Sequence, residues 1–357
     1  MEEILRKLVA FPTITGDETA VHQALDYIAG FVVARGMHVE RFDSNGFESL
    51  IATTTPGNKK PTVMLSAHID VVPAPDTAFA LREDAGKLYG RGVLDMKCAV
   101  AAYLQIIDEL QDHLDEYDFG LMITSDEEIG GKDGIGPLLD EGYAPKVAIL
   151  PDGGDDWQIQ VYSKGFMYVK IAVEGKPAHG SRPWLGDNAN VRLLNIIHEV
   201  QKLFPEQKPD SNTINLGQIN GGNAINQVAD HAEAFVDMRL VNEHEKTRII
   251  KALQEICDRN QAELTFLLNG AAGEFSLDNP YIKPFAACIE EATGAKVVGS
   301  RTLGSNDGRY FAAKHIPCIS FYPTGGDHHG PEEWLDKRAF YQMKDVIKSY
   351  LEKTARQ

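Results

Sequence analysis

The sequence predicts an α/β protein with a mixed, mostly parallel sheet flanked by helices, into which an α+β domain is inserted. Two observations lead to this prediction. Short apolar runs, of the kind that form buried parallel strands, alternate with helical patterns. Near Ser163 the order of the predicted elements changes, and a chain of 357 residues is long enough for a second domain.

The first long helix is expected to begin at Thr15-Gly16-Asp17-Glu18, which fits the S/T-x-x-E capping box. Apolar residues then recur at helical spacing on one face: Val21, Leu25, Ile28 and Val32. Gly36 is expected to end this helix. Strands over residues 37–42 and 50–53 follow.

The central strand is expected over residues 62–66 and leads into a histidine and a carboxylate, His68 and Asp70. Residues two apart in an extended segment point the same way, so both side chains can face one site. A metal-ligating imidazole commonly rests its second ring N–H on a carboxylate. The alternative is a strand end with two solvated polar groups, and this segment alone does not decide between them.

Other predicted strands also end in acidic or histidine side chains. The strand over residues 119–124 leads to Glu127 and Glu128, and the strand over 146–150 leads to Asp152. The strand over 318–322 is followed by His328 and His329. In open α/β sheets, ligands bind outside the carboxyl ends of the strands, so these groups are expected to share one site.

Asp95 precedes a predicted helix that carries apolar residues up to residue 110. A carboxylate in that place can be an ordinary N-cap. It can also join the acidic and histidine side chains at the strand ends.

Several carboxylates in one cleft repel one another unless cations neutralise them. Mixed imidazole and carboxylate ligands suit zinc, and also cobalt or manganese. Two such ions about 3.5–4 Å apart, bridged by one carboxylate, would orient a shared hydroxide for attack on a carbonyl. Of the adjacent Glu127 and Glu128, one can bind a metal while the other acts as a general base.

The inserted domain is expected over residues 163–272, between two parts of a catalytic domain at 1–162 and 273–357. Its predicted elements follow the β-α-β-β-α-β order of a ferredoxin-like unit: 166–173, 188–203, 213–219, 232–240, 243–259 and 263–268. Helices over 280–293, 306–314 and 336–353 resume the α/β pattern.

Composition excludes several classes of partner. The formal net charge of −17 argues against nucleic acid and anionic membranes, which both need basic patches. The four cysteines form no C-x-x-C pair and are expected to be reduced. The first residues lack the apolar segment of a signal peptide, and no long apolar run is present, so a cytoplasmic enzyme is expected.

Four motifs, taken in order, resemble a known family: Ser66–Asp70, Gly92–Lys97, Asp126–Gly131 and His329–Glu333. The chain is similar over nearly its whole length to the co-catalytic metallopeptidases. These include acetylornithine deacetylase, succinyl-diaminopimelate desuccinylase, carboxypeptidase G and several di- and tripeptidases. The resemblance implies a hydrolase that cleaves the amide bond of a small peptide or an N-acyl-amino acid.

The resemblance also implies a role for each site residue. Two Zn²⁺, with Co²⁺ or Mn²⁺ as possible substitutes, would be held by His68 and Asp152, by Glu128 and His329, and by Asp95 as a bridge. Glu127 would be the general base, and Asp70 would support His68. His329 is preferred to His328 because of its spacing to Pro331. The family often has a cis peptide bond after the bridging aspartate.

Residues toward the substrate follow from the same resemblance. His179 matches a histidine of the inserted domain that polarises the scissile carbonyl, although a plain loop histidine is the alternative. Residues that would hold a substrate carboxylate, each with a structural alternative, are Asn226, Arg239, Ser305, Asn306 and Arg309. Asp152 with Gly153-Gly154 looks more like the di- and tripeptidase branch. Relatives form homodimers through the inserted domain, which would bring His179 to the partner's site.

Two other functions remain open from the sequence. One is a relative without activity that binds amino-acid-like ligands, and the other is a dinuclear phosphoesterase.

Overall fold

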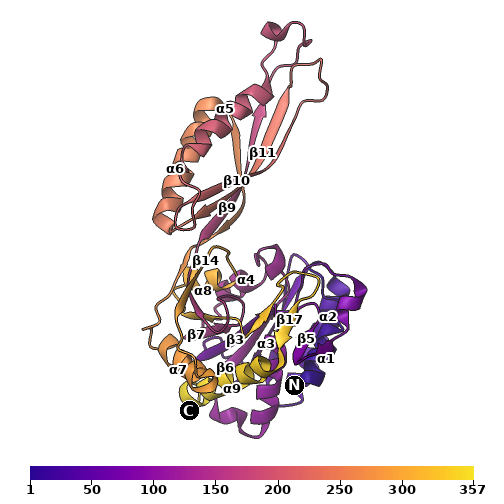
Figure 1. Ribbon diagram of the computed structural model, residues 1–357, viewed down its shortest axis with the longest axis vertical. Helices are drawn as coiled ribbons and strands as arrows, with labels where there is room; N and C mark the ends of the chain where they lie inside the picture. Colours follow the sequence, from indigo (N-terminus) through magenta and orange to yellow (C-terminus); the bar gives the residue numbers. More distant parts are fainter. The chain divides into compact units, whose positions relative to one another are not determined.

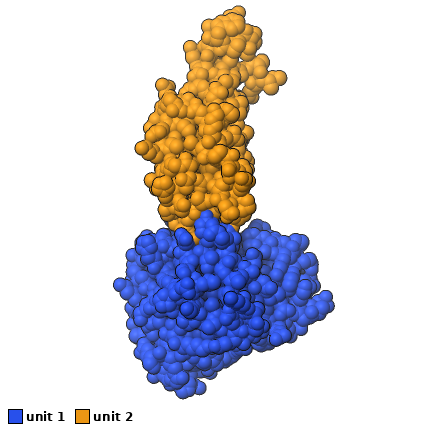
Figure 2. Space-filling view, turned by 60° about the vertical axis from the view of Figure 1, so that its left-hand side comes forward, with its two compact units in different colours: residues 1–162, 274–302, 306–357 blue, residues 163–273, 303–305 orange.

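The computed structural model describes all residues, 1–357, and divides into two compact units (Figure 2). Unit 1 comprises residues 1–162, 274–302 and 306–357. Unit 2 comprises residues 163–273 and 303–305. Each unit has its own hydrophobic core.

Unit 1 is built on a six-stranded mixed sheet, as the sequence predicts. In spatial order the strands are β1 (His38–Ser44), β2 (Phe47–Thr53), β6 (Phe119–Thr124), β3 (Val63–His68), β7 (Val147–Leu150) and β15 (Cys318–Ser320). The pairs from β6 to β15 are parallel, and the pairs of β2 with β1 and β6 are antiparallel. Strands β3, β6 and β7 are fully buried, which explains their continuous apolar sequences.

Helices cover this sheet (Figure 1). They are α1 (Glu2–Val9), α2 (Glu18–Val33), α3 (Lys97–Leu110), α4 (Ile135–Asp140), α7 (Ile282–Thr293), α8 (Gly308–Ala313) and α9 (Lys337–Thr354). Helix α3 packs against β3 and contacts α1, α2 and α9. It is apolar on nearly every side, as a helix in that position must be.

Two smaller sheets were not expected from the sequence, because strands of two to five residues are too short to show a clear periodicity. One consists of β16 (Gly325–Gly326), β17 (Trp334–Asp336), β5 (Lys87–Tyr89) and β4 (Arg82–Asp84). The other consists of β13 (Gly273–Glu274), β8 (Ile159–Ser163) and β14 (Gly299–Thr302). The first sheet fixes the chain on either side of the loop that carries His328 and His329.

Unit 2 has a β-α-β-β-α-β element order. Its elements are β9 (Gly165–Glu174), α5 (Ala189–Gln201), β10 (Thr213–Gly221), β11 (His231–Leu240), α6 (Glu243–Asn260) and β12 (Glu263–Gly270). The antiparallel sheet has the order β10-β11-β9-β12, as in ferredoxin-like units. Alternate residues of β11 are buried, and α5 and α6 lie side by side on the sheet (Figure 1).

One local prediction was wrong, for a physical reason, and one helix was missed. Helix α2 is capped by Asp17, whose side chain accepts from the Ala20 N–H at 3.0 Å. Thr15 cannot act as the cap because its hydroxyl donates to Asp70 at 2.8 Å. The sequence reasoning also missed α1, although Leu5, Leu8 and Val9 form its buried face.

None of the helices combines the length and the hydrophobicity that a bilayer span requires.

Candidate metal centre

His68 lies at the end of β3, where the chain leaves the sheet. Its Nε2 is 3.1 Å from Oδ1 of Asp95, and its Nδ1 is 3.0 Å from the backbone oxygen of Asp70. An Nδ1–H that donates to this carbonyl leaves the lone pair of Nε2 directed at the site. His68 and Asp70 are almost completely buried, so this orientation is fixed.

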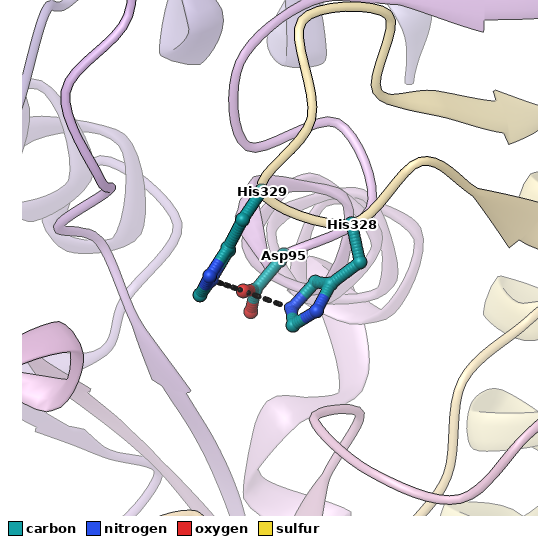
Figure 3. Close-up of side chains that lie close together, drawn as sticks. All are labelled: Asp95, His328 and His329. Carbon is teal, nitrogen blue, oxygen red and sulfur yellow. Dashed lines mark hydrogen bonds and ion pairs between the residues drawn. The ribbon is translucent and has the colours of Figure 1, made fainter.

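Asp95 is the carboxylate on which the histidines converge. It lies just before α3, but the N-cap of that helix is Met96, and no side chain caps it. Instead, Oδ2 of Asp95 lies 2.6 Å from Nε2 of His328 and 3.0 Å from Nε2 of His329 (Figure 3). The Asp95–Met96 peptide bond is cis, as the resemblance implies. The Asp95 side chain therefore faces the three histidines and does not cap the helix.

Two groups of side chains have the spacing of metal ligands. Asp95, His328 and His329 form one, with ligand atoms within 4.8 Å of one another. His68, Glu127 and Asp152 form the other, at the same spacing. Glu128 joins the first group, because its Oε2 lies 3.1 Å from Nε2 of His329. His328 has no such contact with Glu128.

Asp70 holds together three segments that are distant in sequence. Besides His68, its carboxylate accepts from the Thr15 hydroxyl and from the backbone N–H groups of Glu127 and Glu128, the latter two at 3.3 and 3.2 Å. These two N–H groups begin the short 3₁₀ turn Glu127–Ile129. A single buried carboxylate therefore positions the imidazole and both glutamates.

Tyr322 is a site residue that the sequence reasoning missed. The last strand was expected to reach residue 322, but β15 ends at Ser320. Tyr322 therefore lies outside the sheet, and its hydroxyl donates to Oδ1 of Asp152 at 2.6 Å, with Oδ1 of Asp95 at 3.4 Å. No motif signals this tyrosine, since its partners are distant in the sequence.

The donor set fits divalent cations. Oδ2 of Asp152 is buried and has no hydrogen-bond partner, which is costly for a carboxylate unless a cation binds it. Burial, with the nearby Asp95, raises the pKa of Asp152 to about 6. Hydrogen bonds to Asp95 and Glu128 raise the pKa of His329 to about 10. A proton on His329 thus compensates negative charge that metal ions would otherwise neutralise.

Glu127 has the electrostatics of a proton acceptor. Burial and the neighbouring Asp152 carboxylate raise its pKa well above the usual range of a glutamate. Its side chain has no hydrogen bond to another side chain, whereas Glu128 contacts His329. The two adjacent glutamates therefore stand in different environments.

His179 and Asn226 lie together on the surface of unit 2. Gly180 N–H donates to the Asn226 oxygen at 2.7 Å, so the two loops are joined. The backbone N–H of Ser181 donates to Nδ1 of His179 at 3.1 Å. A neutral His179 therefore carries its hydrogen on Nε2, which makes that atom a donor.

The other predicted substrate residues lie elsewhere. Arg239 makes a bidentate ion pair with Asp237 and donates a hydrogen bond to the Tyr168 hydroxyl. Arg309 is 4% exposed and donates to the Gly130 oxygen. Asn306 is buried and donates to the backbone oxygen of Asp152, and the Ser305 hydroxyl has no partner. For Arg309 and Asn306 these contacts fit the positioning of site loops, and their contact with substrate stays a prediction.

A known protein family matches most of this chain. The family described as Peptidase family M20/M25/M40 matches residues 64–353. A succinyl-diaminopimelate desuccinylase of Rickettsia bellii is 26% identical, over 98% of this chain and 95% of that protein.

Solved structures share the fold. A tripeptidase from Staphylococcus aureus is 21% identical, with a TM-score of 0.79 over 100% of this chain and 98% of the other. A metallo-carboxypeptidase from Sulfolobus solfataricus is 18% identical, with a TM-score of 0.79 over 98% of each chain.

Proposed function

Because the chain belongs to peptidase family M20/M25/M40, we propose that it is a dinuclear metal-dependent hydrolase that cleaves an amide bond in a small peptide or N-acyl-amino acid. Membership in the family makes it a hydrolase of amide bonds. The observation that best supports a site for two metal ions is the convergence of His68, His328 and His329 on Asp95. The proposed ligands are His68 and Asp152 for one ion, Glu128 and His329 for the other, and Asp95 for both.

Zn²⁺, Co²⁺ or Mn²⁺ bound there would polarise the substrate carbonyl and lower the pKa of a bound water. Glu127 accepts a proton from the water as its oxygen adds to the carbonyl carbon. The same carboxyl group then returns the proton to the amide nitrogen, and the C–N bond breaks. The raised pKa of Glu127 supports this role, since a general base works best when its pKa lies near the working pH.

His179 of unit 2 would stabilise the tetrahedral intermediate of the reaction. His179 is exposed, and its Nε2–H is available to donate to the oxyanion that forms from the carbonyl. We propose that this happens in a homodimer formed through unit 2, with His179 reaching the partner's site. Asn226, which is hydrogen-bonded to the same turn, would help to hold the substrate.

The substrate class is supported by local sequence. Asp152 with Gly153-Gly154 favours the di- and tripeptidase branch, and the tripeptidase from S. aureus has the same fold. Because one relative is a succinyl-diaminopimelate desuccinylase, N-acyl-amino acids are the second proposed class of substrate. The protein is proposed to act in the cytoplasm.

The experiment that tests the function is a screen of di- and tripeptides and N-acyl-amino acids. Protein stripped with a chelator is compared with the same protein reloaded with Zn²⁺, Co²⁺ or Mn²⁺, and products are identified by mass spectrometry. Metal-dependent cleavage of at least one amide is expected. Binding of such compounds without turnover would favour the inactive relative, and cleavage only of phosphate esters would favour the phosphoesterase.

The choice between the two adjacent histidines can be tested with matched variants. We expect His329→Ala to lose one of two ions, because only His329 contacts both Asp95 and Glu128. His328→Ala is expected to keep both ions, and each is measured by metal analysis after gel filtration. If His328→Ala lost an ion and His329→Ala did not, the assignment would be reversed.

A further inference from the structure

Glu333 is a buried carboxylate that no role at the metal centre explains. It is 2% exposed, and it lies at the end of the loop that carries His329. Its Oε1 accepts the backbone N–H groups of Leu94 and Asp95, at 2.9 and 3.1 Å. Its Oε2 accepts the N–H of Gly92 at 2.9 Å. Three N–H groups of the loop before α3 are therefore tied to one carboxylate.

Arg91 completes this arrangement from the other side. It is 5% exposed, and its Nη1 donates to Oε2 of Glu333 at 2.7 Å. Its Nη2 donates to the backbone oxygens of His329 and Gly330, at 3.2 and 3.1 Å. The planar guanidinium can make these contacts together, which a lysine cannot do.

Arg91 and Glu333 thus join two loops that are distant in sequence. The loop over residues 90–96 carries Asp95, and the loop over 327–333 carries His329. The contacts run in both directions, because each residue of the pair binds backbone groups of the opposite loop.

We propose that the Arg91–Glu333 pair is a positioning clamp that sets Asp95 against His329 before any metal ion binds. As a statement about metal ligands it rests on the proposed function. The physical basis is the cost of an unpaired buried group, since loss of the carboxylate would leave three backbone N–H groups and Nη1 of Arg91 without their acceptor. Ligand side chains held in this way need no reordering when ions bind, which raises affinity.

The chain offers a matched control one residue away. Glu332 pairs with Arg82, but the two side chains are 66% and 50% exposed, and neither contacts residues 90–96. An exposed pair of this kind contributes little to stability. Glu333→Gln and Glu332→Gln therefore make the same chemical change in a clamp residue and in a surface residue.

Glu333→Gln keeps the shape of the side chain but has one oxygen in place of two. Either orientation of the amide turns its NH₂ toward two donors. We expect the affinity for Zn²⁺ to fall by about 10–100-fold, the range for groups that orient metal ligands. We also expect an altered visible absorption of the Co²⁺-loaded protein and a reduced kcat with little change in KM. Glu332→Gln should match the wild type in all three.

Hydrogen exchange on the metal-free protein tests the clamp without the metal. Glu333→Gln is expected to accelerate amide exchange in both loops, 90–96 and 327–333. Arg91→Lys keeps the Glu333 carboxylate and should accelerate exchange mainly in 327–333, where the backbone oxygens of His329 and Gly330 lose their donor. This variant also decides the question if Glu333→Gln fails to fold.

If amide exchange in loops 90–96 and 327–333 were as slow in both clamp variants as in Glu332→Gln, the proposed clamp would be refuted. This holds whatever the metal content of the variants. A wild-type protein that binds no divalent ion would overturn the proposed function instead. Faster exchange without any change in Zn²⁺ affinity or Co²⁺ absorption would refute the link to the metal ligands.

Discussion

We expect turnover to fall by about 10²–10⁴-fold in the Glu127→Gln variant, while both metal ions are retained. The reason is that glutamine cannot accept the proton of the attacking water, although it fills the same space. Glu127 is also the only one of the two adjacent glutamates without a contact to His329. Steady-state kinetics and metal analysis on the same preparation measure the two quantities.

Glu141→Gln is the matched control, because this side chain is 65% exposed at the end of α4. It should behave like the wild type. Loss of one metal ion in Glu127→Gln, or activity close to that of Glu141→Gln, would refute the role of general base and make Glu127 a ligand or a bystander.

The second large effect is expected in His179→Ala. Removal of one oxyanion donor typically lowers the rate by 10²–10³-fold. The metal content should not change, since His179 belongs to unit 2 and the ligands belong to unit 1. His244→Ala is the control, because this histidine also belongs to unit 2 and its side chain is 88% exposed.

Mixed dimers decide from which subunit His179 acts. Co-expression of His179→Ala and Glu127→Gln chains with two affinity tags yields purified heterodimers. The site built on the His179→Ala chain keeps its own Glu127 and receives an intact His179 from the partner. Each mixed dimer should therefore have one working site. Heterodimers as inactive as both parents would mean that His179 acts within its own chain.

The sequence predicts the main sheet, and the edge of the sheet at which the candidate site residues gather, for a physical reason. Parallel strands must be apolar along their whole length, and polar residues can enter only where they end. His68 ends such a strand, and Glu128 and Asp152 follow two others, so the apolar runs locate all three at one edge of the sheet.

Other features depend on contacts that no local pattern encodes. Tyr322 donates to Asp152 from a distance of 170 residues, and Glu333 accepts from Leu94 across 239 residues. Thr15 has the sequence of an N-cap but donates to Asp70, because a tertiary partner competes with the local one. The same competition makes Asp95 a site residue in place of a cap.

The central claim is that this chain holds two divalent ions through a shared carboxylate. Metal analysis of the apoprotein titrated with Zn²⁺ tests it most directly, with Asp95→Ala measured in parallel. Two ions per wild-type chain are expected, together with loss of turnover on chelation and its return on reloading. Asp95→Ala should impair the binding of both ions. Saturation at a single ion, or amide hydrolysis that persists in fully chelated protein, would contradict the dinuclear site.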